Sequence, residues 1–260
     1  MEPRVPTLEM LWEVHDASDV LGARFGFIDG AAEAGRWVAA MCDEYWGVRV
    51  DTCDRIVMSD QNVMAWVDTA SGRMLAKWSV APDRFPRLAA LARLTAWLDA
   101  RGFPVSAPIA ALHGHLQVEV CGASLSLQHE IDGDLLDTTK ADQVRAAGAA
   151  LARLHDALAG YSDDVPGLVA PAPLKTQITG WLGACPEQVP ASGHDCLRRL
   201  VADTQPDPLP VQLVHGDFRS ANVLCDEFGV AAVIDFEEAR FRSWDRGAGA
   251  VGGHARDALP

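Results

Sequence analysis

Two short stretches near the carboxyl end carry the decisive pattern: LVHGDFRSANVL at residues 213–224 and VIDFE at residues 233–237. Asp217 stands five residues before Asn222, and Asp235 follows an apolar run after a short loop. Phosphoryl transfer needs one carboxylate to receive the proton of the attacking hydroxyl. It also needs an amide oxygen and a second carboxylate that hold Mg²⁺ against the nucleotide phosphates. The two stretches together therefore predict kinase-like phosphoryl transfer.

A purely structural interpretation of the first stretch is also open. Asp217 and Asn222 are residue types that form turns, so the stretch can be a solvated turn between two buried strands. That interpretation leaves the second stretch unexplained, because a turn former needs no partner motif at this spacing. The chemical interpretation is therefore preferred.

Composition limits the classes of function. The chain has 260 residues, a formal net charge of -14 and a mean hydropathy of +0.03. Most of such an acidic surface repels a phosphate backbone, which argues against a nucleic-acid partner. No run approaches the ~20 apolar residues of a membrane span. The start of the chain lacks a basic segment leading into an apolar one, and the six cysteines are scattered without a C-x-x-C pair. We therefore expect a cytoplasmic protein with neither a nucleic-acid nor a membrane partner, and leave its oligomeric state open.

Hydrophobic periodicity and turn residues predict the order of elements. The expected elements are a helix at 31–45, strands at 49–58, 63–67 and 74–78, a helix at 86–100, strands at 116–120 and 124–131, and helices at 140–159 and 177–182. Three consecutive strands with tight connections indicate an antiparallel meander. A strand-rich half followed by a helix-rich half that holds both motifs indicates two lobes, which we divide at 1–131 and 132–260.

With these motifs the chain resembles the aminoglycoside phosphotransferase and choline kinase family, the small-molecule branch of the protein-kinase-like fold. The resemblance runs from about residue 48 to 238, and its most specific part is HGD at 215–217 with Asn222, followed by IDF at 234–236. It implies an α+β, bilobal, protein-kinase-like fold. The N-terminal lobe would hold an antiparallel sheet plus a helix, and the C-terminal lobe would be mostly helical.

The resemblance also assigns roles at the two motifs, with ATP and Mg²⁺ as cofactors. Asp217 matches the family's catalytic aspartate. Asn222 matches the metal-binding asparagine, and Asp235 matches the aspartate that bridges Mg²⁺ to the β- and γ-phosphates. Hard oxygen ligands suit Mg²⁺, which supports both metal assignments. His215 is expected to brace its loop by hydrogen bonding rather than to act as a base.

Five further residues are candidate nucleotide ligands. Lys77 lies inside an otherwise apolar strand, where a charge needs a partner or a function, and in the family this lysine contacts the α- and β-phosphates. The alternative is an edge-strand lysine that faces water. Ser59 and Asn62 bound the turn that corresponds to the family's phosphate-covering turn, although a plain hairpin turn explains them equally well. His129 and Ile131 match the interlobe hinge, where backbone groups bond adenine; His129 can equally be an ordinary histidine.

The chain departs from the family pattern in two places. Kinase-like sites pair the strand lysine with a glutamate on the following helix, but no glutamate occurs between residues 84 and 100. The family also continues after the second motif through several helices, whereas residues 246–253 are rich in glycine and lack an apolar stripe. We therefore expect a C-terminal lobe without its last helices.

These observations favour an ATP- and Mg²⁺-dependent phosphotransferase that acts on a hydroxyl of a small molecule, such as an aminoglycoside-like antibiotic or an amino alcohol. Two alternatives stay open. One is a truncated, catalytically silent nucleotide-binding protein, suggested by the two departures. The other is a kinase for serine or threonine in a peptide.

Overall fold

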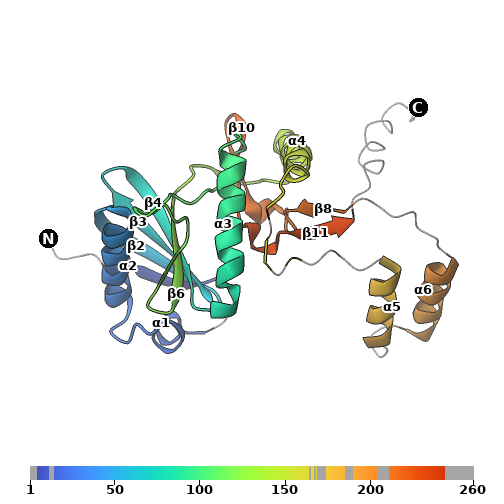
Figure 1. Ribbon diagram of the computed structural model, residues 1–260, viewed down its shortest axis with the longest axis horizontal. Helices are drawn as coiled ribbons and strands as arrows, with labels where there is room; N and C mark the ends of the chain where they lie inside the picture. Colours follow the sequence, from blue (N-terminus) through green and yellow to red (C-terminus); the bar gives the residue numbers. More distant parts are fainter. Residues whose placement is uncertain are drawn as a thin grey trace.

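Six strands form one sheet in the amino-terminal half, in the order β1-β2-β3-β4-β6-β5 (Figure 1). They are β1 (Thr7–Met10), β2 (Val50–Met58), β3 (Asn62–Thr69), β4 (Gly72–Ser79), β5 (Val118–Val120) and β6 (Ala123–His129). This computed structural model describes residues 5–11, 15–163, 165, 166, 168, 174–184, 190–203 and 211–243. The predicted meander is confirmed as β2-β3-β4. The sequence pattern does not predict β1, which pairs with β2 in parallel.

Alternation along β4 explains how the sheet is covered. Met74, Ala76 and Trp78 are buried in a core with helices α1 (Ala17–Phe25) and α2 (Ala31–Trp46). Because successive side chains of a strand point to opposite faces, Lys77 points away from that core. Figure 1 shows α2 on one face of the sheet and α3 (Phe85–Asp99) on the other. The lysine-bearing face of β4 is therefore the face that looks toward α3.

A second core joins α3 to the carboxyl-terminal half. Leu91, Leu94 and Leu98 of α3 cluster with Leu154 of α4 (Ala141–Leu158) and with residues near the two motifs. The spacing of the three leucines puts them on one helix face, as the sequence predicts. This core draws on residues from both sides of position 131, so the division of the chain at that residue remains a proposal.

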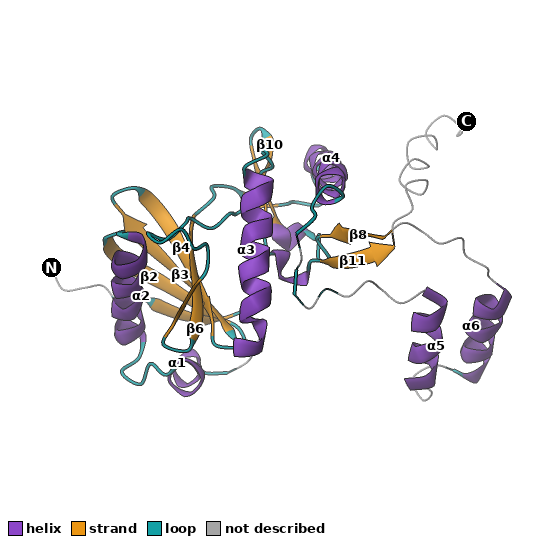
Figure 2. Cartoon of the chain, viewed as in Figure 1, coloured by secondary structure: helices purple, strands orange, loops and turns teal. Residues whose placement is uncertain are grey.

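Short strands frame the motifs in the carboxyl-terminal half. Strands β10, β9 and β7 form one small sheet, and β11 and β8 form another (Figure 2). Their bounds are β7 (Asp134–Leu135), β8 (Val211–Val214), β9 (Val223–Asp226), β10 (Gly229–Val233) and β11 (Arg240–Ser243). Single 3-10 turns lie at the motifs: η2 (Ser220–Asn222) is within the first, and η3 (Phe236–Glu238) begins within the second. A further 3-10 turn, η1 (Pro82–Arg84), leads into α3.

Two helices stand apart from the rest of the protein in Figure 1. Helix α5 (Leu174–Ala184) includes the predicted helix at 177–182, and α6 (Ala191–Asp203) is not predicted by the sequence pattern. The helices contact each other, and His194 Nε2 lies 2.9 Å from the Leu182 carbonyl oxygen. The predicted absence of the last helices concerns residues after 243, outside the described residues. No helix in the described ranges is long and apolar enough to cross a membrane.

Candidate functional site

Two loops form the candidate site, and both follow short strands. The first loop comprises residues 215–222 after β8, and the second loop comprises residues 235–240 after β10. His215 joins them because its imidazole bonds to both. Its Nε2 donates to the Ile234 carbonyl oxygen at 3.0 Å, and its Nδ1 accepts from the Asp217 amide at 3.3 Å. A carbonyl can only accept and an amide N–H can only donate, so this pair of contacts assigns the neutral Nε2–H tautomer.

The electrostatics of His215 agree with that tautomer. The side chain is 1% exposed, and burial lowers the pKa of its imidazole below the ordinary 6.5. The Ile234 carbonyl and the carboxylates of Asp235 and Asp217 oppose this shift but do not outweigh it. The expectation that His215 braces its loop by hydrogen bonding agrees with these two contacts.

Three more contacts hold the loops together. The Ile234 amide donates to the Asn222 carbonyl oxygen at 3.0 Å. Gly216 has a φ of +85°, and a Cβ at this position would overlap the main-chain carbonyl of Glu238. Arg240 Nη2 donates to the Gly216 carbonyl oxygen at 2.8 Å. The first loop can therefore approach the second only because residue 216 has no side chain.

Asp217 and Asn222 are directly bonded. Asn222 is buried, and its Nδ2 donates to both the main-chain oxygen and Oδ2 of Asp217, each at 2.9 Å. These two acceptors determine the orientation of the amide, so Oδ1 of Asn222 faces away from Asp217. Arg219 Nε lies 2.9 Å from the same Oδ2 of Asp217. Within the described ranges, Oδ1 of Asp217 makes no hydrogen bond, so one carboxylate oxygen is held and the other is available.

Asp235 begins the second loop in an uncommon backbone conformation. Its φ of +63° is left-handed, and among the described non-glycine residues only Cys121 shares a positive φ. Such conformations cost free energy and occur often at functional sites. The Asp235 side chain is exposed, and its carboxylate forms no hydrogen bond or ion pair with the residues that the structure describes. The bond between Ile234 and Asn222 brings Asp235 beside the first loop.

Lys77 lies in the interior of the large sheet. Strand β4 is bonded to β3 on one side and to β6 on the other, with Lys77 opposite Met64 and Ser126. The alternative of an edge-strand lysine is therefore wrong. The side chain is half-buried, and its ammonium forms no hydrogen bond or ion pair in the described part of the chain. A half-buried cation without a protein partner favours an anionic ligand.

The two turn candidates have protein partners. The Ser59 amide donates to the Asn62 carbonyl oxygen at 2.9 Å, which closes the β2–β3 hairpin. The Asn62 Nδ2 donates to Oε2 of Glu237 at 3.1 Å. The hairpin thus reaches the second loop, and the contact with the nucleotide stays a prediction for both residues.

The two hinge candidates lie at the end of β6. His129 is exposed, and it lines a pocket of about 380 Å³ together with Ile131. The other lining residues come from the segment around Val105 and Pro108 and from the end of α3, and neither Asp217 nor Asp235 is among them. The role of the hinge in adenine binding therefore stays a prediction.

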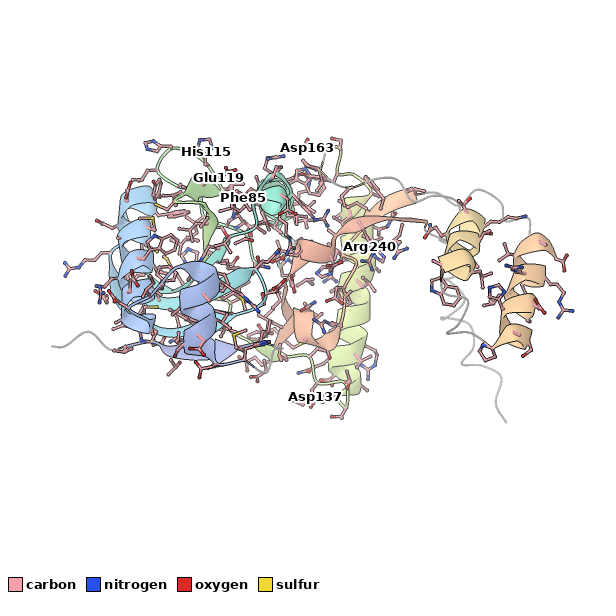
Figure 3. All side chains as sticks on the ribbon, turned by 90° about the horizontal axis from the view of Figure 1, so that it is seen from below. Phe85, His115, Glu119, Asp137, Asp163 and Arg240 are labelled. Atoms are coloured by element: carbon pink, nitrogen blue, oxygen red, sulfur yellow. The ribbon has the colours of Figure 1, made fainter. Side chains whose placement is uncertain are left out.

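Several residues of the site are not predicted by the sequence pattern. Arg84 and Arg87, at the start of α3, bond to the second loop, and Arg219 and Arg240 bond to the first. Phe85, the first residue of α3, and Arg240, the first residue of β11, are labelled in Figure 3. Arg219 offers a signal within the quoted motif, a cation two residues after Asp217. Arg240 lies three residues after the second motif, whereas nothing local relates Arg84 and Arg87 to either motif.

The donor set suits a hard divalent cation. The available oxygens are Oδ1 of Asn222 and the carboxylate of Asp235, and Mg²⁺ prefers such oxygen ligands, commonly completed by water and phosphate. Lys77 adds a positive charge on the sheet face that looks toward α3. Each of these groups can bind or neutralise phosphate or its metal, and Asp217 keeps one carboxylate oxygen available.

Comparison with solved structures supports the fold. The chain is similar to the amicoumacin kinase hAmiN, solved with AMP-PNP, Ca²⁺ and Ami, at a TM-score of 0.60 and 13% identity over 80% of this chain. It is similar to the macrolide 2'-phosphotransferase MphH from Brachybacterium faecium at a TM-score of 0.63 and 18% identity over 88% of this chain. A third similar structure is the spectinomycin phosphotransferase APH(9)-Ia with ADP and spectinomycin, at a TM-score of 0.55 and 15% identity over 80% of this chain. The kinase-like α+β fold is thereby confirmed.

The length that is matched differs among these proteins. The chain spans 65% of the amicoumacin kinase, 70% of the spectinomycin phosphotransferase and 84% of the macrolide phosphotransferase. No curated protein sequence matches the chain significantly. The sequence model of the phosphotransferase enzyme family, APH, matches residues 59–242, which include both loops and Lys77. The chain therefore belongs to the APH phosphotransferase enzyme family.

Proposed function

We propose that this protein is an ATP- and Mg²⁺-dependent phosphotransferase that acts on a hydroxyl group of a small molecule. The observation that carries the proposal is the hydrogen bonding between the two loops. Asn222 bonds through its side chain to Asp217 and through its main chain to the residue before Asp235. Residues suited to hold a metal and to receive a proton thus share one bonded unit, as phosphoryl transfer requires.

Asn222 and Asp235 would hold Mg²⁺, and Lys77 would bond the nucleotide phosphates. When bound, the metal supplies positive charge that neutralises the phosphoryl oxygens. The two proposed metal ligands, Asn222 and Asp235, are held in position in different ways. Asn222 is buried, and its Oδ1 is aimed by the two bonds that Nδ2 donates to Asp217. Asp235 is exposed and is oriented by its backbone.

Asp217 would orient the acceptor hydroxyl and receive its proton. Its Oδ2 is held by Asn222 and Arg219, which leaves Oδ1 to accept a hydrogen bond from the hydroxyl. Because this carboxylate is already held in place, less rotational freedom has to be lost when it positions the hydroxyl for reaction.

The acceptor is proposed to be an aminoglycoside-like antibiotic or an amino alcohol. The similar structures include proteins named for the antibiotics amicoumacin, spectinomycin and macrolides. The formal charge of -14 agrees with a cationic acceptor, because an acidic surface attracts amino groups.

Turnover of ATP in the presence of Mg²⁺ tests the proposal, with aminoglycosides, other antibiotics, choline and homoserine as acceptors. The mass of the acceptor should increase by that of one phosphoryl group. The Asp217→Asn variant should lose most of this activity, whereas Asp51→Asn, at an exposed position on β2, should keep it.

Three results would contradict the proposal in different ways. Calorimetric binding of Mg²⁺-ATP without turnover on any acceptor would favour a catalytically silent nucleotide-binding protein. Phosphorylation of basic peptides but of no small molecule would favour a peptide kinase. Folded protein that neither binds nor turns over ATP would exclude nucleotide chemistry.

A further inference from the structure

The start of α3 is bonded to the second loop by two arginines. Arg84 Nη2 lies 2.8 Å from Oε2 of Glu237. Arg87 Nη2 donates to the main-chain oxygens of Glu237 at 2.8 Å and Ala239 at 2.7 Å. We call these two arginines the arginine clamp. It binds both a side chain and the backbone of the loop that begins at Asp235.

Glu237 is the point where three elements meet. Its Oε2 accepts from Arg84 at the start of α3 and from Asn62 in the β2–β3 hairpin, at 2.8 and 3.1 Å. The side chains of Glu237 and Arg84 are only 23% and 31% exposed. Partly buried ion pairs are screened less than exposed ones, so this pair is expected to hold its geometry in salt.

The clamp differs from the contact that this helix usually makes in kinase-like sites. Kinase-like sites place a glutamate on the helix and pair it with the strand lysine, but α3 contains no glutamate. Here the helix carries the cations and the second loop carries the carboxylate. Helix α3 is therefore bonded to the second loop, and the ammonium of Lys77 is left without a partner among the described residues.

Asp235 needs such support because its conformation is costly. A left-handed aspartate persists only where the surrounding structure imposes it. On its amino side, the Ile234 amide is bonded to Asn222. On its carboxyl side, the described contacts to the backbone include those of Arg87 on the carbonyls of residues 237 and 239.

We propose that Arg84 and Arg87 are positioning residues that hold the second loop so that the Asp235 carboxylate stays oriented toward Mg²⁺. The role in metal binding rests on the function proposed above. The contact between α3 and the second loop does not, since it consists of the ion pair and hydrogen bonds of Arg84 and Arg87 described above.

Hydrogen–deuterium exchange on the free, full-length protein tests the contact itself. Arg87→Ala should accelerate amide exchange across the second loop by about tenfold or more, because local opening then needs fewer bonds to break. Arg84→Ala should act in the same direction. Arg93→Ala is the matched control, because among the described residues this exposed arginine of α3 bonds only to the Ala89 carbonyl oxygen of its own helix. Circular dichroism establishes that each variant is folded.

Titration with Mg²⁺ in the presence of AMP-PNP tests the positioning. Removal of a residue that orients a metal ligand typically costs about 10- to 100-fold in metal affinity, and we expect losses in this range for Arg87→Ala. Arg87→Lys should restore part of the affinity. Glu237→Gln should weaken binding in the same direction as Arg84→Ala, and the double variant should lose less than the sum of the two, since both changes act on the ion pair between Arg84 and Glu237.

Each outcome decides a separate part of the proposal. Unchanged exchange in both alanine variants overturns the clamp. Faster exchange with unchanged Mg²⁺ affinity overturns the positioning of Asp235. Wild-type protein that fails to bind Mg²⁺-AMP-PNP overturns the proposed function together with the metal part of this proposal, while the exchange result still decides the clamp.

Discussion

The side-chain nitrogen of Asn222 donates to both the main-chain oxygen and the Oδ2 carboxylate oxygen of Asp217, each at 2.9 Å. One buried amide thus aims its own oxygen and holds half of a neighbouring carboxylate. The metal ligand and the proton acceptor are therefore prepared by the same pair of bonds.

Replacement of Asn222 by alanine should remove both effects. The free energy of unfolding should fall by about 1–3 kcal/mol, because the buried bonds to Asp217 are lost. Affinity for Mg²⁺-AMP-PNP should fall as well. Urea denaturation and calorimetry measure the two losses. Ser124→Ala serves as the control, because this buried hydroxyl has no hydrogen-bond partner within the described residues and lies in β6. Unchanged metal affinity in Asn222→Ala would contradict the assigned role.

Replacement of Gly216 by alanine should separate the two loops. The left-handed φ alone costs a residue with a Cβ about 1–2 kcal/mol. Gly114 has a φ of +82°, and a Cβ added there would have no atom within 4 Å, so Gly114→Ala isolates that cost. Gly216→Ala should lose about 1–3 kcal/mol more than this control, because the Cβ overlaps the Glu238 carbonyl. If thermal denaturation shows the same loss of stability in Gly216→Ala and Gly114→Ala, the close approach of the two loops does not contribute to stability.

Stability should fall as the pH is lowered below about 6.5. Burial lowers the pKa of His215 and of His155 from the ordinary 6.5, so both protonate more readily in the unfolded chain. Their contribution is complete above pH 6.5 and declines as the pH falls toward their folded-state pKa values, by at most about 1.4 kcal/mol per pH unit for each group.

Urea denaturation at pH 7.5, 6.5 and 5.5 measures this dependence on pH. His215→Gln should flatten the profile, whereas His115→Gln, which removes an exposed imidazole, should leave it unchanged. A profile of the same slope in His215→Gln and in the wild type would argue against a buried neutral imidazole.

Replacement of Lys77 by methionine should reduce nucleotide affinity without loss of stability. The ammonium has no hydrogen bond or ion pair within the described part of the chain, so its removal breaks no polar contact with those residues. Affinity for Mg²⁺-AMP-PNP should fall about 10- to 100-fold, since charge-assisted hydrogen bonds contribute about 1.5–3 kcal/mol. Lys140→Met, at an exposed position before α4, is the control. A Lys77→Met variant that unfolds more easily but binds Mg²⁺-AMP-PNP normally would indicate that Lys77 has a structural role and does not bind the nucleotide.

Local patterns in the sequence predict much of the fold. The alternation of Met74, Ala76 and Trp78 predicts β4, and the leucines at helical spacing predict α3. The sequence patterns considered above do not include β1 and α6. β1 is only four residues long and pairs in parallel with β2, a contact that no local pattern encodes.

The same distinction between local and long-range relationships applies to the candidate site. By itself, the sequence determined the spacing of Asp217, Asn222 and Asp235 and the presence of a lysine within an apolar strand. The three motif residues stand close together in the sequence, and a charge within an apolar strand is chemically distinctive. Only the tertiary structure decided what holds them: Arg84 meets Glu237 across 153 residues, and Gly216 meets the Glu238 backbone. Such contacts depend on how the helix and the two loops pack together, and the burial that drives this packing has no signature in either segment alone.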